Sequence, residues 1–147
     1  MLYAFFLTVS LILLNLLFAS TVIVRNSAGL QKAVHGCNQA CSIQLAPTTI
    51  FLNQTIQISG DIEIEIYSVD RFSAILTSDV LMFDVTNSAT LYLRDMTMEM
   101  RPTAGRLRNG GAVSVQQSSF SMLNIIVTSL KYLYFHICFS FYSQTSR

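Results

Sequence analysis

Apolar and polar residues alternate in several short segments between Ser20 and Leu130. In Ile62–Ile66 every isoleucine falls on one face of an extended chain, and Glu63 and Glu65 fall on the other. Alternation with a period of two is typical of a short strand with one buried face. The same pattern predicts strands at Ile56–Ile58, Phe83–Val85, Leu91–Leu93, Met96–Met100, Val113–Val115 and Phe120–Met122. The middle of the chain is therefore predicted to be all-β, with turns at the Gly-, Asn- and Ser-containing segments between strands.

The predicted strands recur at a regular spacing. Ile56–Ile58 and Ile64–Ile66 return as Phe83–Val85 and Leu91–Leu93, with the same offset in both cases, and a third copy begins at Val113. Periods of about 20–50 residues are typical of stacked repeats, in which each unit buries its apolar face against its neighbours. The spacing therefore predicts a short stack of about three to four coils.

Residues 26–36, which precede the strands, have a helical rather than an alternating pattern, with an apolar face formed by Leu30, Ala33 and Val34. Asn26 or Ser27 is suited to cap the free N–H groups at the start of the helix. Gly36 is suited to the left-handed position that ends many helices. We expect an amphipathic helix that caps the N-terminal end of the β-stack.

The residues that follow this helix give the chain a family resemblance. After Leu30–Val34 come a cysteine turn and three apolar segments, Ile43–Pro47, Thr49–Leu52 and Ile56–Ile58. This order resembles the entry into a right-handed parallel β-helix of the pectin-lyase-like superfamily. Gly110–Val113 (Gly-Gly-Ala-Val) resembles a tetrapeptide that recurs in polymorphic outer-membrane proteins and other cell-surface β-helix proteins. The resemblance covers residues 28 to about 130 and implies a non-catalytic surface protein of this fold.

The strand pattern alone also allows a second fold, a small antiparallel β-sandwich. In this alternative the chain is membrane-anchored, with Met1–Ala19 retained and the strands paired antiparallel. We expect the parallel β-helix and keep the antiparallel β-sandwich as the alternative.

Met1–Ala19 is an uncharged apolar segment, which predicts either a secretory signal peptide or a transmembrane anchor. We favour a cleaved signal, because the segment barely reaches the ~20 residues that a spanning helix needs. Small residues at Ala19–Thr21 also suit cleavage. Both interpretations place the rest of the chain outside the cytosol, secreted or at the cell surface, with membrane attachment only through Met1–Ala19 if it is retained.

The predicted organisation has three parts. Residues 1–20 are the signal peptide or anchor, residues 21–130 are the β-helix repeats, and residues 131–147 form an aromatic tail. The segment Lys131–Tyr142 has six aromatic residues and no turn residue. We interpret this tail as the truncated or mispredicted end of a longer solenoid.

The cysteines and one sequon fit an exported chain. Cys37 and Cys41 are the natural disulfide pair, because a turn between them brings their Cα atoms within the required distance, which leaves Cys138 unpaired. Asn53, in the sequence Asn53-Gln54-Thr55, is a candidate glycosylation site.

The charges and motifs indicate binding rather than catalysis. With 9 Lys+Arg, 8 Asp+Glu and no basic run, the chain lacks the footprint of a nucleic-acid-binding protein. No paired Asp, Gly-His-Gly, nucleophile-elbow or zinc-hydrolase motif occurs, so we expect no catalytic residue, metal site or cofactor. The expected role is structural or adhesive, with an extracellular glycan or surface protein as partner. The alternative is an N-terminal fragment of a polysaccharide lyase or glycoside hydrolase.

Overall fold

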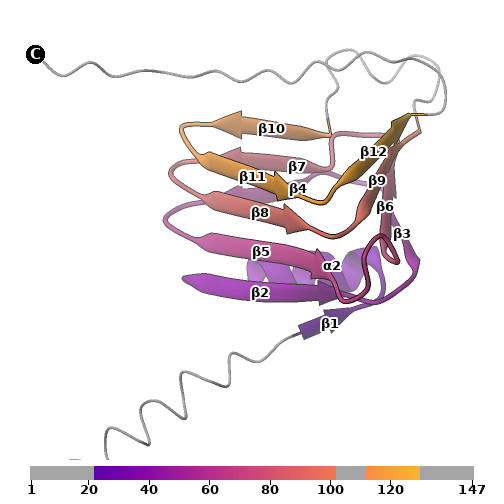
Figure 1. Ribbon diagram of the computed structural model, residues 1–147. Coiled ribbons are helices and arrows are strands. Elements are labelled where there is room, and N and C mark those ends of the chain that lie inside the picture. Colours follow the sequence, from indigo (N-terminus) through magenta and orange to yellow (C-terminus); the bar gives the residue numbers. More distant parts are fainter. Residues whose placement is uncertain (1–21, 102–111, 130–147) are drawn as a thin grey trace, which may run out of the picture.

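The computed structural model describes residues 22–101 and 112–129, shown in colour in Figure 1. Within these ranges the chain forms one helix, α2 (Ser27–His35), and a series of short strands. The strands are β1 (Val22–Val24), β2 (Ala40–Leu45), β3 (Thr49–Leu52), β4 (Ile56–Ser59), β5 (Glu63–Ser68), β6 (Ile75–Ser78), β7 (Phe83–Thr86), β8 (Thr90–Arg94), β9 (Thr97–Met100), β10 (Val113–Gln116), β11 (Ser119–Leu123) and β12 (Ile126–Ser129).

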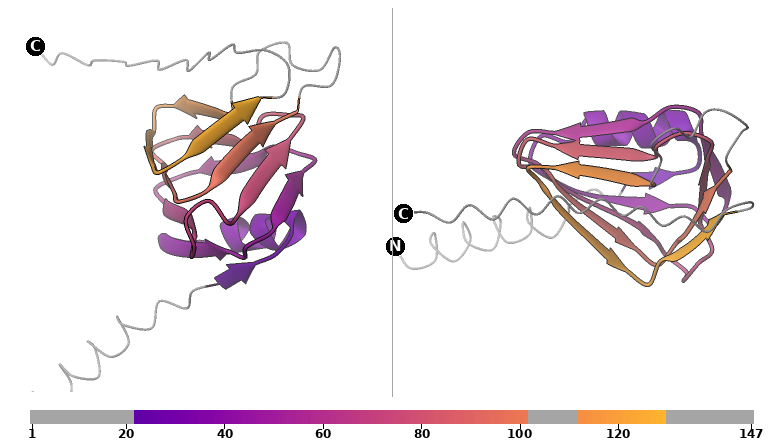
Figure 2. Two further views of the ribbon diagram at one scale, coloured as in Figure 1. Left: turned by 45° about the vertical axis from the view of Figure 1, so that its right-hand side comes forward. Right: turned by 90° about the horizontal axis from the view of Figure 1, so that it is seen from above.

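All strand pairs in the described residues are parallel, and the strands form three sheets. Sheet A has the order β1-β2-β5-β8-β11, sheet B the order β12-β9-β6-β3, and sheet C the order β10-β7-β4. The chain passes repeatedly from sheet A to sheet B to sheet C, so that successive layers stack on one another (Figures 1 and 2). This arrangement is that of a parallel β-helix, and the antiparallel β-sandwich alternative is wrong for the described residues.

The strand register confirms the predicted repeat. Ile56 pairs with Phe83 across β4 and β7, and Ile64 pairs with Leu91 across β5 and β8, both at the predicted offset. Val113 pairs with Phe83 and so forms the third layer of sheet C. Because neighbouring strands of a sheet lie about 4.8 Å apart, each inward side chain packs directly on its counterpart in the next layer.

The inward faces of the three sheets form one continuous apolar core. Its fully buried side chains include Ile43, Leu52, Ile58, Ile66, Leu76, Phe83, Leu91 and Met98. The outward faces carry the polar partners of the alternating pattern, such as Glu65 on β5 and Asp84 on β7. The alternation in the sequence therefore reflects the inside and the outside of the stack.

Left-handed residues occur where the chain leaves one sheet for the next. Gly60, Asn87 and Gln117 have positive φ at the equivalent point after β4, β7 and β10. Asp95 and Asn124 do so after β8 and β11, and the Asn124 side-chain amide donates to Asp95 Oδ1 at 2.7 Å. Glycine adopts this conformation without strain, and Asn and Asp adopt it more readily than most other residues. These residues set the sharp corners of the stack.

Helix α2 caps one end of the core. Its N-cap is Asn26, whose side chain accepts a hydrogen bond of 2.8 Å from the Gly29 N–H, as expected for one of the two candidate caps. Leu30 and Val34 are buried, and the helix contacts β1, β2, β3 and β4. We call this the helix end of the stack, and it lies at the lower end in Figure 1.

The expectation for Gly36 is wrong. Gly36 has φ −80° and ψ −6°, which is right-handed, and its N–H donates to Lys32 O at 3.0 Å. The Cys37 N–H then donates to Val34 O at 3.1 Å. The chain thus leaves the helix through one more right-handed turn, so that no left-handed residue is needed before the cysteine loop.

Cys37 and Cys41 form a disulfide with a Cα–Cα distance of 5.9 Å, as predicted. The bond joins the end of α2 to the beginning of β2 and pins the turn between them. No helix of the described residues is long and apolar enough to span a membrane. Met1–Ala19, Gly110, Gly111, Cys138 and the aromatic tail lie outside the described residues.

The pairing of the cysteines gives a simple chemical test. Alkylation of the denatured, unreduced protein should add one label per chain, at Cys138, because Cys37 and Cys41 are already bonded to each other. After reduction the same treatment should add three labels, which intact-mass spectrometry counts. Three labels before reduction would contradict the local disulfide.

Candidate functional site

The outer face of sheet A carries two rows of polar and aromatic side chains. The first row runs across the sheet through Ser42, Glu65, Tyr92 and Ser121, and the second through Gln44, Tyr67, Arg94 and Leu123. We call the six residues on β2, β5 and β8 the sheet A face: Ser42, Gln44, Glu65, Tyr67, Tyr92 and Arg94. Their strands are adjacent, so these side chains form a continuous surface.

Glu65 lies at the centre of this face and is held by two donors. Ser42 Oγ donates to Glu65 Oε2 at 2.9 Å, and Arg94 Nη2 lies 3.0 Å from Glu65 Oε1. Hydrogen bonds to a carboxylate from a cationic partner are stronger than neutral ones. The carboxylate therefore ties three adjacent strands together on the outer surface and fixes the orientation of Arg94.

Arg94 in turn fixes a tyrosine. Its guanidinium carbon lies 5.0 Å from the centre of the Tyr67 ring, within the range of a cation–π contact. Its Nε is also 3.9 Å from a carboxylate oxygen of Asp95. Tyr92, in contrast, exposes 39% of its surface. The sheet A face thus has one ring, Tyr67, with the Arg94 guanidinium over it, and a second ring, Tyr92, that is exposed.

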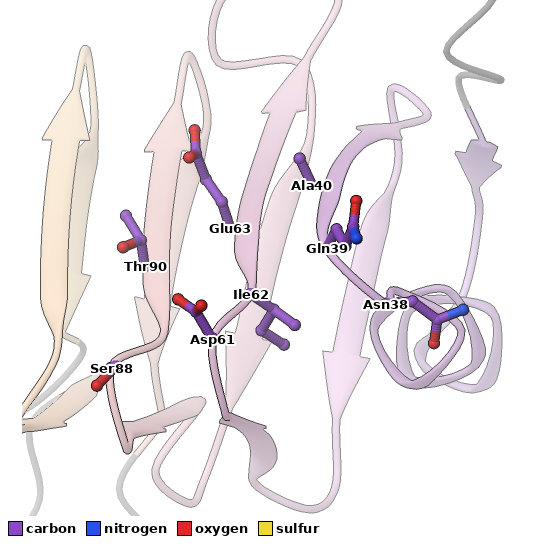
Figure 3. Close-up of a pocket in the computed structure, with 8 residues that line it drawn as sticks. All are labelled: Asn38, Gln39, Ala40, Asp61, Ile62, Glu63, Ser88 and Thr90. Carbon is purple, nitrogen blue, oxygen red and sulfur yellow. The ribbon is translucent and has the colours of Figure 1, made fainter.

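A hollow of about 500 Å³ adjoins this face at the beginning of the sheet A strands. It is lined by Asn38, Gln39, Ala40, Asp61, Ile62, Glu63, Ser88 and Thr90 (Figure 3). Amides, hydroxyls and carboxylates predominate, and none of the lining residues is basic. Figure 3 shows Asp61 and Ser88 at the turns that lead into β5 and β8, with Glu63 and Thr90 on those strands.

The hollow and the sheet A face are parts of one surface. Glu63 and Glu65 are two residues apart on β5, and Thr90 and Tyr92 are two apart on β8, so each pair faces the same side. The Cys37–Cys41 disulfide closes the loop that supplies Asn38, Gln39 and Ala40 to the wall of the hollow. The predicted disulfide therefore shapes the site without being a ligand-binding group.

Asn53 lies apart from this surface. It is exposed in the turn between β3 and β4, where sheet B meets sheet C, and Thr55 of the same sequon is partly exposed. An attached glycan at that turn would leave the sheet A face open.

Sequence reasoning missed the tyrosines and the arginine of the sheet A face. The sequence nevertheless contained a sign of this face. The core positions Ile64 and Leu91 are separated by one repeat. The same separation relates Glu65 to Tyr92 and Tyr67 to Arg94. Applying the repeat offset to the outward positions would have aligned them.

The described ranges contain no group of three or more His, Cys, Asp or Glu side chains that could hold a metal ion. No protein-family model, curated protein or solved structure matches the chain. The geometry of the surface offers an exposed aromatic ring, an oriented guanidinium and a row of hydroxyl, amide and carboxylate groups.

Proposed function

We propose that the protein is a secreted or cell-surface parallel β-helix protein, right-handed like the pectin-lyase-like proteins that its sequence resembles, and that its sheet A face binds a glycan. The observation that carries the proposal is the continuous outward surface formed by Tyr92, Tyr67, Arg94 and Glu65 on adjacent strands. No catalytic step is part of the proposal.

The chemistry of this face suits a sugar. A pyranose has an apolar C–H face and a rim of hydroxyl groups, so it needs an exposed ring and hydrogen-bonding groups beside that ring. Tyrosine supplies a broad apolar surface with a polar end, and Tyr92 is the more exposed of the two tyrosines. Ser42, Glu65 and Thr90 lie on the same strands and supply donors and acceptors.

The form of the face suits an extended glycan rather than a small molecule. Small-molecule sites are concave and bury most of their ligand. Here the tyrosines stand on the outer side of a sheet, and the adjoining hollow is more open than enclosed. A polysaccharide chain could lie across β2, β5 and β8 with sugar units on the rings and in the hollow.

The charges favour a neutral glycan. Asp61, Glu63 and Glu65 lie on this surface, and the cation beside them, Arg94, is already paired with Glu65. Opposing an acidic sugar to these carboxylates would cost binding energy, because like charges across an interface repel. We therefore expect neutral polysaccharides to bind better than polygalacturonate.

Export of the chain agrees with its disulfide. Structural disulfides form in oxidising compartments and are rare in the cytosol. The Cys37–Cys41 bond and the exposed Asn53 are both compatible with a protein of the extracellular space. The signal peptide and the glycosylation of Asn53 are parts of this proposal.

Replacing Tyr92 with alanine should weaken glycan binding by about tenfold or more, equivalent to ~1.4 kcal/mol, because exposed aromatic residues often dominate binding surfaces. Isothermal titration with soluble β-glucan, xylan and mannan, and with polygalacturonate as the acidic comparison, measures the affinities.

Phe51→Ala is the matched control, since Phe51 is an aromatic residue 48% exposed on the outer face of sheet B. It should bind like the unmodified protein. Equal loss in both variants, or no binding to any glycan, would contradict the proposal. Release of new reducing ends or unsaturated products from a polysaccharide would show instead a fragment of a hydrolase or lyase.

A further inference from the structure

The end of the stack opposite α2 is open in the described residues. Its last layer consists of β10, β11 and β12, and each of these strands is the edge of its sheet. We call this layer, residues 112–129, the open end. It lies at the upper end in Figure 1.

Inward side chains are covered less well at the open end than one layer below. Met122 pairs with Leu93, and the exposed fraction rises from 1% for Leu93 to 41% for Met122. Val113 and Val115 are partly exposed, whereas their partners on β7 are fully buried. The apolar core of the stack therefore continues to this surface and stops there.

The open end also carries no charge. Residues 112–129 contain no Asp, Glu, Lys, Arg or His, whereas strands of the two layers directly below carry charged outward residues such as Glu65 on β5 and Glu99 on β9. Edge strands in soluble proteins usually carry lysines, prolines or inward charges that prevent pairing with another chain. These three edge strands carry none of these, so within the described ranges their backbone groups and inward apolar side chains are left free to contact another chain.

From these observations we propose that the open end is the interface of a symmetric dimer, in which two copies of this chain join their stacks end to end. In a two-fold contact the same surface meets itself, so a charge near the axis would oppose its own copy. Because the open end is uncharged, two copies of it can meet without such repulsion.

The helix end of the stack limits the proposed assembly to two copies. There α2 contacts β3 and β4, which are the first layers of sheets B and C, and it carries exposed Lys32 and His35. A second copy cannot continue these two sheets through the helix, so head-to-tail growth is blocked. Two open ends that face each other give one longer column with a helix cap at each end, as a stable solenoid requires.

The test is the mass of the secreted full-length protein in solution, measured by sedimentation equilibrium over a range of concentrations. The proposal predicts a dimer. Met122→Lys and Val127→Lys place a lysine at inward positions of the open end on β11 and β12, where Met122 is 41% exposed and Val127 is partly exposed, so the monomer has room for the charge. Each should raise the dimer dissociation constant at least tenfold, since the new charges face each other.

Two control variants have similar exposure elsewhere. Phe51→Lys changes a residue that is 48% exposed on the side of the stack, and Val22→Lys one that is 47% exposed on β1 at the helix end. Both should remain dimers, and far-UV circular dichroism should show all four variants folded.

Three results would overturn the proposal. One is a monomeric unmodified protein. Another is dissociation by Val22→Lys, which would place the contact at the helix end. The third is a monomer that becomes a dimer when residues 131–147 are deleted, which would show that the chain's own C-terminal segment covers the open end.

Discussion

Phe83→Ala is expected to lower the free energy of unfolding by about 3–5 kcal/mol, the usual cost of removing a buried phenylalanine ring. Phe83 is fully buried at the start of β7, the central strand of sheet C, between Ile56 of β4 and Val113 of β10. A smaller side chain there leaves a cavity between two layers, which the strands above and below cannot close without losing their register. Urea unfolding followed by far-UV circular dichroism measures the loss.

Phe51→Ala removes the same ring from the outer face of β3, where it is half-exposed. Changes at such surface positions usually alter stability by less than about 0.5 kcal/mol. All variants are compared at one protein concentration, because a dimer gains stability as concentration rises. Equal urea midpoints for the two alanine variants would show that Phe83 is not in the core of a stack.

Leu30→Ala is expected to cost about 2–5 kcal/mol, the range for large-to-small changes in a core. Leu30 is fully buried on the inner side of α2, and the helix covers the layer formed by β3 and β4. Removal of the leucine side chain leaves a cavity and weakens the packing of α2 on the stack. The buried side chains of Ile50 and Ile56 then become accessible to water and to other chains. Thermal unfolding should occur at a lower temperature and be accompanied by aggregation, measured by light scattering.

Lys32→Ala is the control for the cap. Lys32 is exposed on the same helix, and alanine is a better helix former than lysine, so the helix itself is preserved. The control should unfold near the temperature of the unmodified protein. If Leu30→Ala did the same, α2 would not be a cap on the core.

The sequence predicts best those strands that have one buried and one solvent-facing side. β4, β5, β7 and β8 alternate strictly, because their inward isoleucines, leucines and phenylalanine are separated by outward polar residues. The register between them follows from the same pattern, since one wrong step would turn the apolar set outward. The offset that pairs Ile56 with Phe83 could therefore be predicted from the sequence alone.

β6 shows where this reasoning fails. Its residues Ile75–Ser78 do not alternate, because the polar Thr77 and Ser78 are both buried. Ser78 Oγ donates to Leu52 O at 2.8 Å, which satisfies a hydroxyl inside the stack. Only tertiary contacts with β3 supply that partner, so local patterning predicts no strand here.

Corner turns of different length also hide the repeat in sheet B. The turn after β5 is long and is closed by hydrogen bonds of Ser68 and Ser73 to Asp70 O, at 2.7 and 2.9 Å. Ile75 then pairs with Thr97, a shorter offset than the one that separates Ile64 from Leu91 in sheet A. The repeat is regular only where the turns have equal lengths, which the sequence does not reveal.

The candidate site could be predicted only in part for a related reason. The disulfide follows from a local spacing, but the sheet A face depends on outward residues that come together from three layers. Glu65 and Arg94 are far apart in sequence, and their contact exists only because β5 and β8 are neighbours. Until the register is known, these residues look like the ordinary polar half of alternating strands.

The most direct test of the account is an NMR titration of the ¹⁵N-labelled protein with the neutral oligosaccharide that binds best. The account predicts that the amides whose signals shift belong to Ser42, Glu65, Tyr67, Tyr92 and Arg94, which are scattered in sequence but adjacent across sheet A. Signals from the outer faces of sheets B and C should stay in place. Shifts confined to those other sheets, or no shifts with any glycan, would contradict the claim that the parallel stack presents a glycan-binding face on sheet A.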